Sequence, residues 1–356
     1  MNGGPAGVGA TAPHFGISAY DIPLAEVGVL AARAEELGFD RISLGEHLVA
    51  PTERRTPYPY AAGSNAYVTY SPADAASAIS DPFVLLSWIA ARTTRLRVAT
   101  GIHLVASTHP LLTARACVTL QTLAGGRFEL GVGAGWMAEE LEAVGVPFGE
   151  RASRAAEALE VVEAALRGGP IEHHGRHFAF SGVAVTPRPV AVPIVVGGTS
   201  PAALRRAARF GDGWYSTPAD DVARCVELRA RIEALRAEVG RADRPFAYHV
   251  RLHDATPEGA ARYVEAGFTD LTIGHADLWP KAEGLDLAAK LDRLEACAEA
   301  FGIGAPYPAG SGGRGASVPG PVPVPATGDR DAGWGGGSPA AVGAGARGVD
   351  GEERRP

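Results

Sequence analysis

The chain has 356 residues, 46% of them hydrophobic and 21% charged, so it can bury a full core as one large domain or two ordinary ones. Its formal net charge of -7 argues against a nucleic-acid binder, because neutralising phosphates requires a concentrated basic face. Nothing in it approaches the roughly 20 apolar residues that span a bilayer, and no secretory signal opens it, so we expect a cytoplasmic protein without membrane contact. Its 3 widely spaced cysteines predict neither disulfides nor a zinc site.

Taken in order, short β-branched runs alternate with helical patterns about eight times, which is typical of a parallel sheet beneath a layer of helices. The first helix is expected over Leu24–Leu37, where apolar residues recur at three-to-four spacing and Gly38 can form a left-handed cap. A later one is expected over Pro201–Phe210. The expected strands cover residues 14–18, 40–44, 96–103, 128–132, 193–196, 213–216, 246–249 and 270–273.

Two stretches interrupt this alternation. Residues 51–80, rich in Pro, Tyr, Ser and Ala, are too many for an ordinary loop after the second strand. We interpret them as a lid or a wall of a substrate pocket, with a decorative insertion as the alternative. Residues 168–189 contain three close histidines, His173, His174 and His177. Their flanking glycine and phenylalanines favour a hairpin over a metal site, and no metal is expected.

The two ends of the chain differ from the middle. From residue 304 onward there are 15 glycines and 8 prolines, a composition that cannot bury enough apolar surface to fold. We therefore expect a flexible N-terminus over residues 1–13, one folded domain over residues 14–303 and a disordered tail over residues 304–356.

Candidate reactive side chains follow several predicted strands, and in a (β/α)8 barrel such positions share one face. Glu46 and His47 follow the second strand and His103 ends the third. Imidazole suits proton transfer near neutral pH, although each histidine could instead bond a loop backbone. His47 is the first candidate, because it follows an acidic residue and precedes the long loop. Further candidates near the late strands are His249, Arg251, His253 and His275.

Two glycine-rich turns suggest ligand contacts. Gly197, Gly198, Thr199 and Ser200 lie between a strand and a helix, so their N–H groups predict a phosphate cradle, with an ordinary turn as the alternative. Arg205 and Arg206 would add positive charge there if they face inward.

The other turn, residues 131–136, is not a dinucleotide fingerprint. Trp136 occupies the place of its third glycine, and Glu139 and Glu140 would repel a pyrophosphate. We expect Gly133 and Gly135 to let a planar ring lie close to the backbone beside Trp136.

Six phrases follow one another in the order and spacing of a known family: residues 34–40 (AEELGFD), 94–101 (TRLRVATG), 125–136 (GGRFELGVGAGW), 145–151 (GVPFGER), 196–208 (VGGTSPAALRRAA) and 211–214 (GDGW). With these the chain resembles the luciferase-like monooxygenase superfamily, and within it the branch of coenzyme F420-dependent oxidoreductases. The resemblance covers nearly all of residues 14–302.

The resemblance implies a luciferase-like (β/α)8 TIM barrel. It places Glu46 and His47 beside the reactive carbon of a flavin-like ring, a non-proline cis peptide at Gly101–Ile102 under that ring, and the phosphate loop from Val196 to Ser200. Trp136 stands where relatives that oxidise sugar phosphates carry a catalytic Glu, so sugar phosphates are not the expected substrates.

The predicted function is hydride transfer between the deazaflavin coenzyme F420 and a small organic substrate, with His47 handling the proton and His103 and His249 as second candidates. One alternative is an FMN-dependent monooxygenase that uses reduced flavin, supplied by a flavin or F420 reductase as partner, and O2. The other is a flavin-binding barrel without catalysis. The resemblance also implies a homodimer through the outer helices.

Overall fold

The computed structural model describes residues 12–304 apart from 21, 54, 58, 60–79, 188–189 and 281–282. The expected tail and flexible N-terminus lie almost wholly outside the described residues, as does most of the loop over residues 51–80. None of the described helices is both long and apolar enough to cross a bilayer.

The described strands close into a barrel, which confirms the predicted fold class. Nine strands form one sheet in which every pairing is parallel. Its order is β3-β2-β1-β11-β10-β9-β8-β5-β4, and β3 also pairs with β5, so the ring is complete. Because β3 and β4 are successive pieces of one strand position, the barrel is eightfold. Its strands are β1 His14–Ala19, β2 Arg41–Leu44, β3 Arg97–Thr100, β4 His103–Leu104, β5 Phe128–Gly133, β8 Ile194–Gly197, β9 Gly213–Tyr215, β10 Ala247–Arg251 and β11 Asp270–Gly274.

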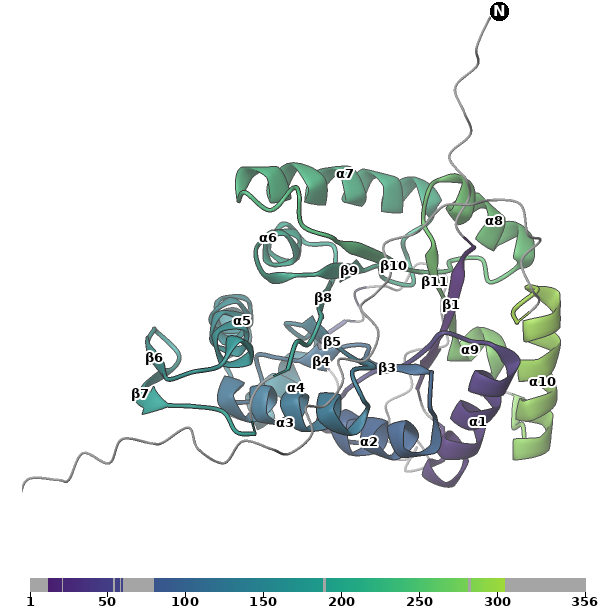
Figure 1. The fold of residues 1–356 in the computed structure, drawn as a ribbon, viewed down its shortest axis with the longest axis horizontal. Coiled ribbons are helices and arrows are strands. Elements are labelled where there is room, and N and C mark those ends of the chain that lie inside the picture. The colour runs from purple at the N-terminus through teal and green to yellow at the C-terminus, as the bar shows by residue number, and fades with distance from the viewer. Residues whose placement is uncertain are drawn as a thin grey trace, which may run out of the picture. The chain divides into compact units, whose positions relative to one another are not determined.

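Helices surround this barrel (Figure 1). Both helices whose limits the sequence predicted are confirmed at both ends. Gly38 takes a φ of 98° after α1, and the Ser200 hydroxyl accepts a hydrogen bond from Ala203 N at the start of α6. The helices are α1 Leu24–Leu37, α2 Pro82–Arg92, α3 Pro110–Leu123, α4 Ala138–Ala143, α5 Arg151–Arg167, α6 Pro201–Phe210, α7 Val222–Glu238, α8 Pro257–Glu265, α9 His275–Leu278 and α10 Leu287–Ala300.

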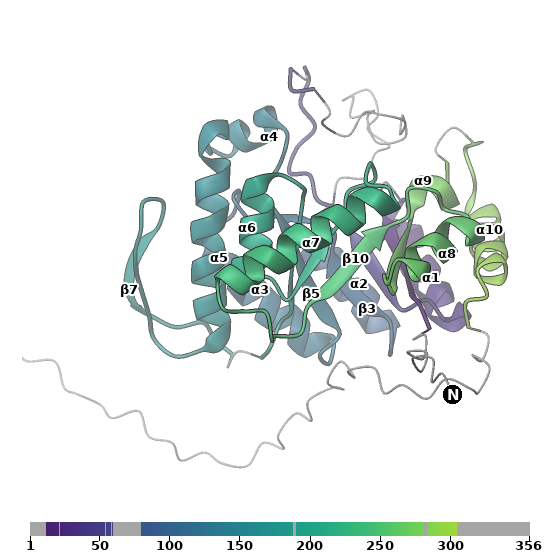
Figure 2. The same cartoon turned by 90° about the horizontal axis from the view of Figure 1, so that it is seen from above.

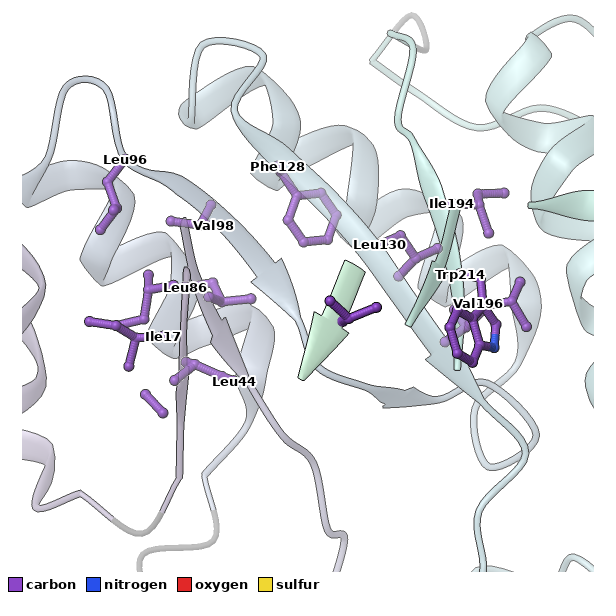
Figure 3. Close-up of a cluster of buried hydrophobic side chains, with 14 of the residues drawn as sticks. Ile17, Leu44, Leu86, Leu96, Val98, Phe128, Leu130, Ile194, Val196 and Trp214 are labelled. Atoms are coloured by element: carbon purple, nitrogen blue, oxygen red, sulfur yellow. The ribbon is translucent and has the colours of Figure 1, made fainter. Parts of the chain in front are cut away.

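The apolar core lies between the barrel and its helices. Side chains alternate across each strand, and the outward positions carry the large apolar residues that pack against the helices. Ile17, Val98 and Phe128 are examples, and the close-up in Figure 3 shows them with Leu86 from α2.

The barrel interior is polar by contrast. Inside it, Glu129 Oε1 accepts from Arg97 Nη1 at 2.9 Å, and Arg41 contacts both Glu129 and His249. Burial first, and then the charges of Arg41 and Arg97, hold the pKa of His249 well below its usual range. His249 is therefore a neutral member of this buried network.

The structure shows how the long predicted third strand and the histidine-rich stretch fold. The expected strand over residues 96–103 is broken into β3 and β4, and the break carries the Gly101–Ile102 cis peptide that the resemblance implied. The stretch with three histidines forms the antiparallel hairpin of β6 Ile171–His174 and β7 Ala179–Val183, as predicted. Figure 2 shows this hairpin beside α5, outside the barrel.

Candidate functional site

A cavity of about 800 Å³ opens at the carboxyl ends of the barrel strands, where the sequence predicted the site. Because the same ring of loops supplies both groups, His47 and the turn around Gly197 face one space. The predicted site residues that line it are Glu46, His47, Gly101, Ile102, Gly133, Gly135, Trp136, Gly197, Gly198, Thr199 and Ser200. Among the other predicted residues, Arg206 and Arg251 also line it, whereas His103, Val196, Arg205, His249, His253 and His275 do not.

His47 is held by a carboxylate that sequence reasoning had assigned differently. Its Nδ1 lies 3.1 Å from Oε1 of Glu140, whose side chain is 1% exposed, and Glu140 also accepts a hydrogen bond from Leu48 N. The ring of Trp136 meets that of His47 edge to face, 5.9 Å between centroids. Glu140 comes from α4, so a helix fixes the orientation of an imidazole that borders the cavity.

Glu46 pairs with His103 and not with His47, its neighbour in the sequence. Its Oε2 lies 2.8 Å from Nδ1 of His103 and accepts from Leu104 N at 2.6 Å. Burial alone would raise the pKa of Glu46, but the contacts with His103 and Leu104 outweigh burial and lower it. Glu46 is therefore an anion at the cavity wall.

The prediction of His103 as a second proton carrier is not supported by its position. His103 is 2% exposed, and its other nitrogen, Nε2, lies 3.2 Å from the hydroxyl of Thr113. Both ring nitrogens therefore face protein groups. His103 fixes Glu46 from behind.

Glycines on two neighbouring strands make room for Ile102 beside the cavity. A Cβ at Gly133 would lie 1.8 Å from Cδ1 of Ile102, and one at Gly197 would lie 3.1 Å from its Cγ2. A Cβ at Gly131 would lie 2.0 Å from the carbonyl oxygen of Thr100. Ile102 therefore sits in the space that Gly133 and Gly197 leave and forms the floor of the cavity, whereas Gly131 admits the carbonyl group of Thr100.

One end of the cavity is cationic. Arg206 of α6 and Arg151 of α5 line it together with Thr199 and Ser200 at the start of α6. The pKa of Arg206 is lowered to about 10, mainly by burial and then by the charges of Arg151 and Arg205. In the described part of the chain, no ion pair joins Arg206 to a carboxylate. Of the two arginines expected to add positive charge here, Arg206 faces inward and is 7% exposed, whereas Arg205 is exposed on the outside of α6.

The described beginning of the long loop forms part of the wall. Thr56, Pro57 and Pro59 line the cavity, whereas residues 60–79 lie outside the described residues. Glu139 of α4 accepts hydrogen bonds from the backbone N–H groups of Arg55 and Thr56. These bonds and that of the Thr56 hydroxyl outweigh burial and lower the pKa of Glu139 to about 2.

The wall facing β9 and β10 is polar. Arg251, at the end of β10, lines the cavity with Ser18, Ser216 and Thr217. Two other late candidates lie elsewhere: His253 Nδ1 lies 3.1 Å from the carbonyl oxygen of Pro218, and His275 packs against Tyr20 with 5.7 Å between ring centroids.

Sequence reasoning missed the roles of Glu140 and Arg151. Glu140 had been interpreted only as a group that repels phosphate, and Arg151 only as a residue of the family pattern. A signal existed for Glu140, since it lies in the first turn of a short helix that follows Trp136 at the carboxyl end of a strand. Nothing local marks Arg151, because its side chain reaches the cavity only through the packing of α5.

Solved structures share this fold. The coenzyme F420-dependent tetrahydromethanopterin reductase of Methanopyrus kandleri superposes with a TM-score of 0.62 at 17% identity, over 82% of this chain and 98% of that one. Riboflavin lyase, solved with modified FMN and riboflavin, superposes with a TM-score of 0.57 at 17% identity, over 72% of this chain and 66% of that one. Neighbours in fold thus include both F420 and FMN proteins.

Sequence comparison identifies the family. An uncharacterized protein of Mycobacterium tuberculosis is 34% identical over 276 residues, which are 76% of this chain and 92% of that protein. The family model for luciferase-like monooxygenases matches residues 5–310. On this match, the chain belongs to the luciferase-like monooxygenase family.

Proposed function

We propose that this protein is an oxidoreductase that transfers a hydride between the deazaflavin coenzyme F420 and a small organic substrate. The observation that carries the proposal is a single cavity with two chemically different ends, one lined by Arg151 and Arg206 and the other by His47. Its volume of about 800 Å³ lies in the range of sites for small molecules and cofactors.

The cationic end fits a cofactor phosphate. Arg206 is buried without a carboxylate partner among the described residues, which is costly unless an anion arrives. The N-terminus of α6 offers N–H groups beside it, at Thr199 and Ser200. We assign the phosphate to these groups and the ring to the floor over Ile102, between Gly133 and Gly197.

Each wall residue then has a task. The bound deazaflavin supplies or accepts the hydride. His47 holds or moves the matching proton at Nε2, because Glu140 occupies the side of Nδ1. Glu140 orients the imidazole, Trp136 packs against it, and Leu104 and Ile102 keep the apolar part of the cavity dry.

Cofactor titration tests this proposal. Quenching of F420 fluorescence by the purified protein, compared with quenching of FMN fluorescence, measures the two affinities. We expect F420 to bind more tightly. Binding of FMN without binding of F420 would refute F420 as the cofactor and favour a monooxygenase that takes reduced flavin and O2.

A second measurement separates an enzyme from a carrier. Reduced F420 is incubated with the protein and a set of small carbonyl compounds, and absorbance of the reoxidised cofactor is followed. We expect reoxidation that is at least about 100-fold slower in His47→Ala, since general acid–base catalysis typically contributes that much. Equal rates for both proteins would identify a binding protein without catalysis by His47.

A further inference from the structure

The wall of the cavity at the end of β10 carries a second buried cation that the cofactor phosphate does not need. Arg251 is 5% exposed, and its position at the end of β10 aims it into the barrel mouth. Parallel register places Ser18 of β1 beside Gly274 of β11, next to the strand of Arg251. Arg251 and Ser18 therefore line the cavity from the two strands on either side of β11.

The backbone of β11 is shaped for the Arg251 guanidinium. A Cβ at Gly274 would lie 1.5 Å from Nη2 of Arg251, so the guanidinium crosses the strand where any other residue would displace it. The Ser216 hydroxyl accepts a hydrogen bond from Arg251 N at 2.8 Å, and Arg251 Nη2 lies 3.2 Å from Oδ2 of Asp277. The cation is thus fixed at one place in the wall.

In the described part of the cavity wall, the acidic side chains bind groups other than Arg251. The Asp277 side chain is 41% exposed, so water screens much of its charge. Among the described lining residues, the acidic ones are Glu46 and Asp220. Glu46 is bound to His103, and Asp220 Oδ2 accepts from both the N–H and the hydroxyl of Thr217 at 2.7 Å.

The neighbours of Arg251 connect it to the proposed reaction centre. The ring of Tyr20 lies between His275 and His47, 5.7 Å and 6.1 Å from them by centroid. Burial and the charge of Arg251 lower the pKa of His275 to about 3, so His275 adds no second positive charge. One fixed cation thus stands across Tyr20 from His47.

The charges at the two ends of the cavity indicate which ligand each end binds. The other end of the cavity has two arginines and a helix N-terminus, which suits the phosphate of the cofactor. Arg251 offers one guanidinium that already shares charge with Asp277, and this suits a planar monoanion. We propose that the substrate is a small organic carboxylate, whose carboxylate binds Arg251 while its reactive carbon lies towards His47. This inference rests on the proposed function for the reaction but not for the binding of the anion.

Calorimetry of the protein without cofactor tests the site, with benzoate as the probe and benzyl alcohol as its neutral counterpart of similar size. We expect benzoate to bind at least about tenfold more tightly than benzyl alcohol, and Arg251→Met to remove this preference. Arg206→Met is the control for binding in the phosphate end and should leave benzoate affinity within about twofold. Loss of benzoate binding in Arg206→Met but not in Arg251→Met would overturn the proposal, as would equal affinity for the two probes.

A variant at Asp277, the exposed ion-pair partner of Arg251, tests the proposal even if Arg251→Met does not fold. Asp277→Asn removes the carboxylate that competes for the guanidinium, so it should tighten benzoate binding by about threefold or more. Unchanged or weaker binding would contradict a role for Arg251.

F420 titrations of the same proteins separate this inference from the proposed function. We expect Arg251→Met to bind F420 within about twofold of the natural protein. If F420 does not bind at all while benzoate still requires Arg251, the cofactor proposal fails and the carboxylate site stands. If Arg251→Met instead loses F420, Arg251 belongs to the cofactor and the substrate proposal fails.

Discussion

The contact between Gly133 and Ile102 can be measured as a coupling energy. In Gly133→Ala the new Cβ would lie 1.8 Å from Cδ1 and 3.2 Å from Cγ1 of Ile102, closer than any real Cβ contact at the first atom. Gly133 does not take a positive φ, so the cost comes from this overlap and not from backbone strain. Ile102 must rotate or shift, and overpacking of this kind costs about 1–3 kcal/mol.

The clash disappears when the isoleucine is shortened. Ile102→Ala removes Cδ1 and Cγ1, and the nearest remaining atom of residue 102 is its Cβ, 3.9 Å from the new methyl group, an ordinary contact. In that background Gly133→Ala should cost less than about 0.5 kcal/mol, since it also reduces the entropy of the unfolded chain. The expected coupling energy is therefore about 1–3 kcal/mol.

Urea unfolding of the four proteins, followed by circular dichroism, gives this energy directly. Gly149→Ala is a matched control, because no atom lies within 4 Å of a Cβ at that position. Equal costs of Gly133→Ala with isoleucine and with alanine at residue 102 would refute the packing argument. F420 quenching on the same proteins would then report whether Ile102 supports the ring.

Three further changes probe the site and the fold. Glu140→Gln should lower kcat about tenfold or more and leave F420 affinity unchanged, because the charge that orients His47 is lost. Steady-state kinetics compares this variant with Glu142→Gln, a change at an exposed residue of the same helix, and equal kcat values for the two would contradict the prediction. Arg206→Met should weaken F420 binding at least about tenfold and raise the Tm of the free protein, since a buried cation is removed. Fluorescence titration measures the affinity and calorimetry the Tm. A lower Tm would contradict the argument that Arg206 carries an uncompensated charge. Burial opposes ionisation of Glu35, but backbone N–H donors outweigh it and lower its pKa from 4.5 to about 2. Its stabilisation is therefore complete above pH 4.5 and is lost as the pH falls towards 2, so melting curves of Glu35→Gln should show a smaller loss of Tm over that interval than the natural protein.

Local sequence determined the elements and the face that carries the site. The limits of α1 follow from apolar spacing and the Gly38 cap, and those of α6 from Ser200 and Pro201, because capping and turn chemistry act within a few residues. The alternation of strands and helices predicted a parallel sheet covered by helices, and the family resemblance implied that the sheet closes into a barrel. The barrel in turn places His47 and Gly197 around one mouth.

Only the tertiary structure decided the partners. The pairs His47 with Glu140 and Glu46 with His103 join residues 93 and 57 positions apart, so no local pattern connects them. The same holds for the glycines that admit Ile102 and for Gly274, which admits Arg251. Side chains at the mouth of a barrel come from separate strands, and their distances depend on register and packing around the whole ring. The sequence alone therefore predicted most of the residues that line the mouth, whereas the fold added Arg151 and decided which residues touch.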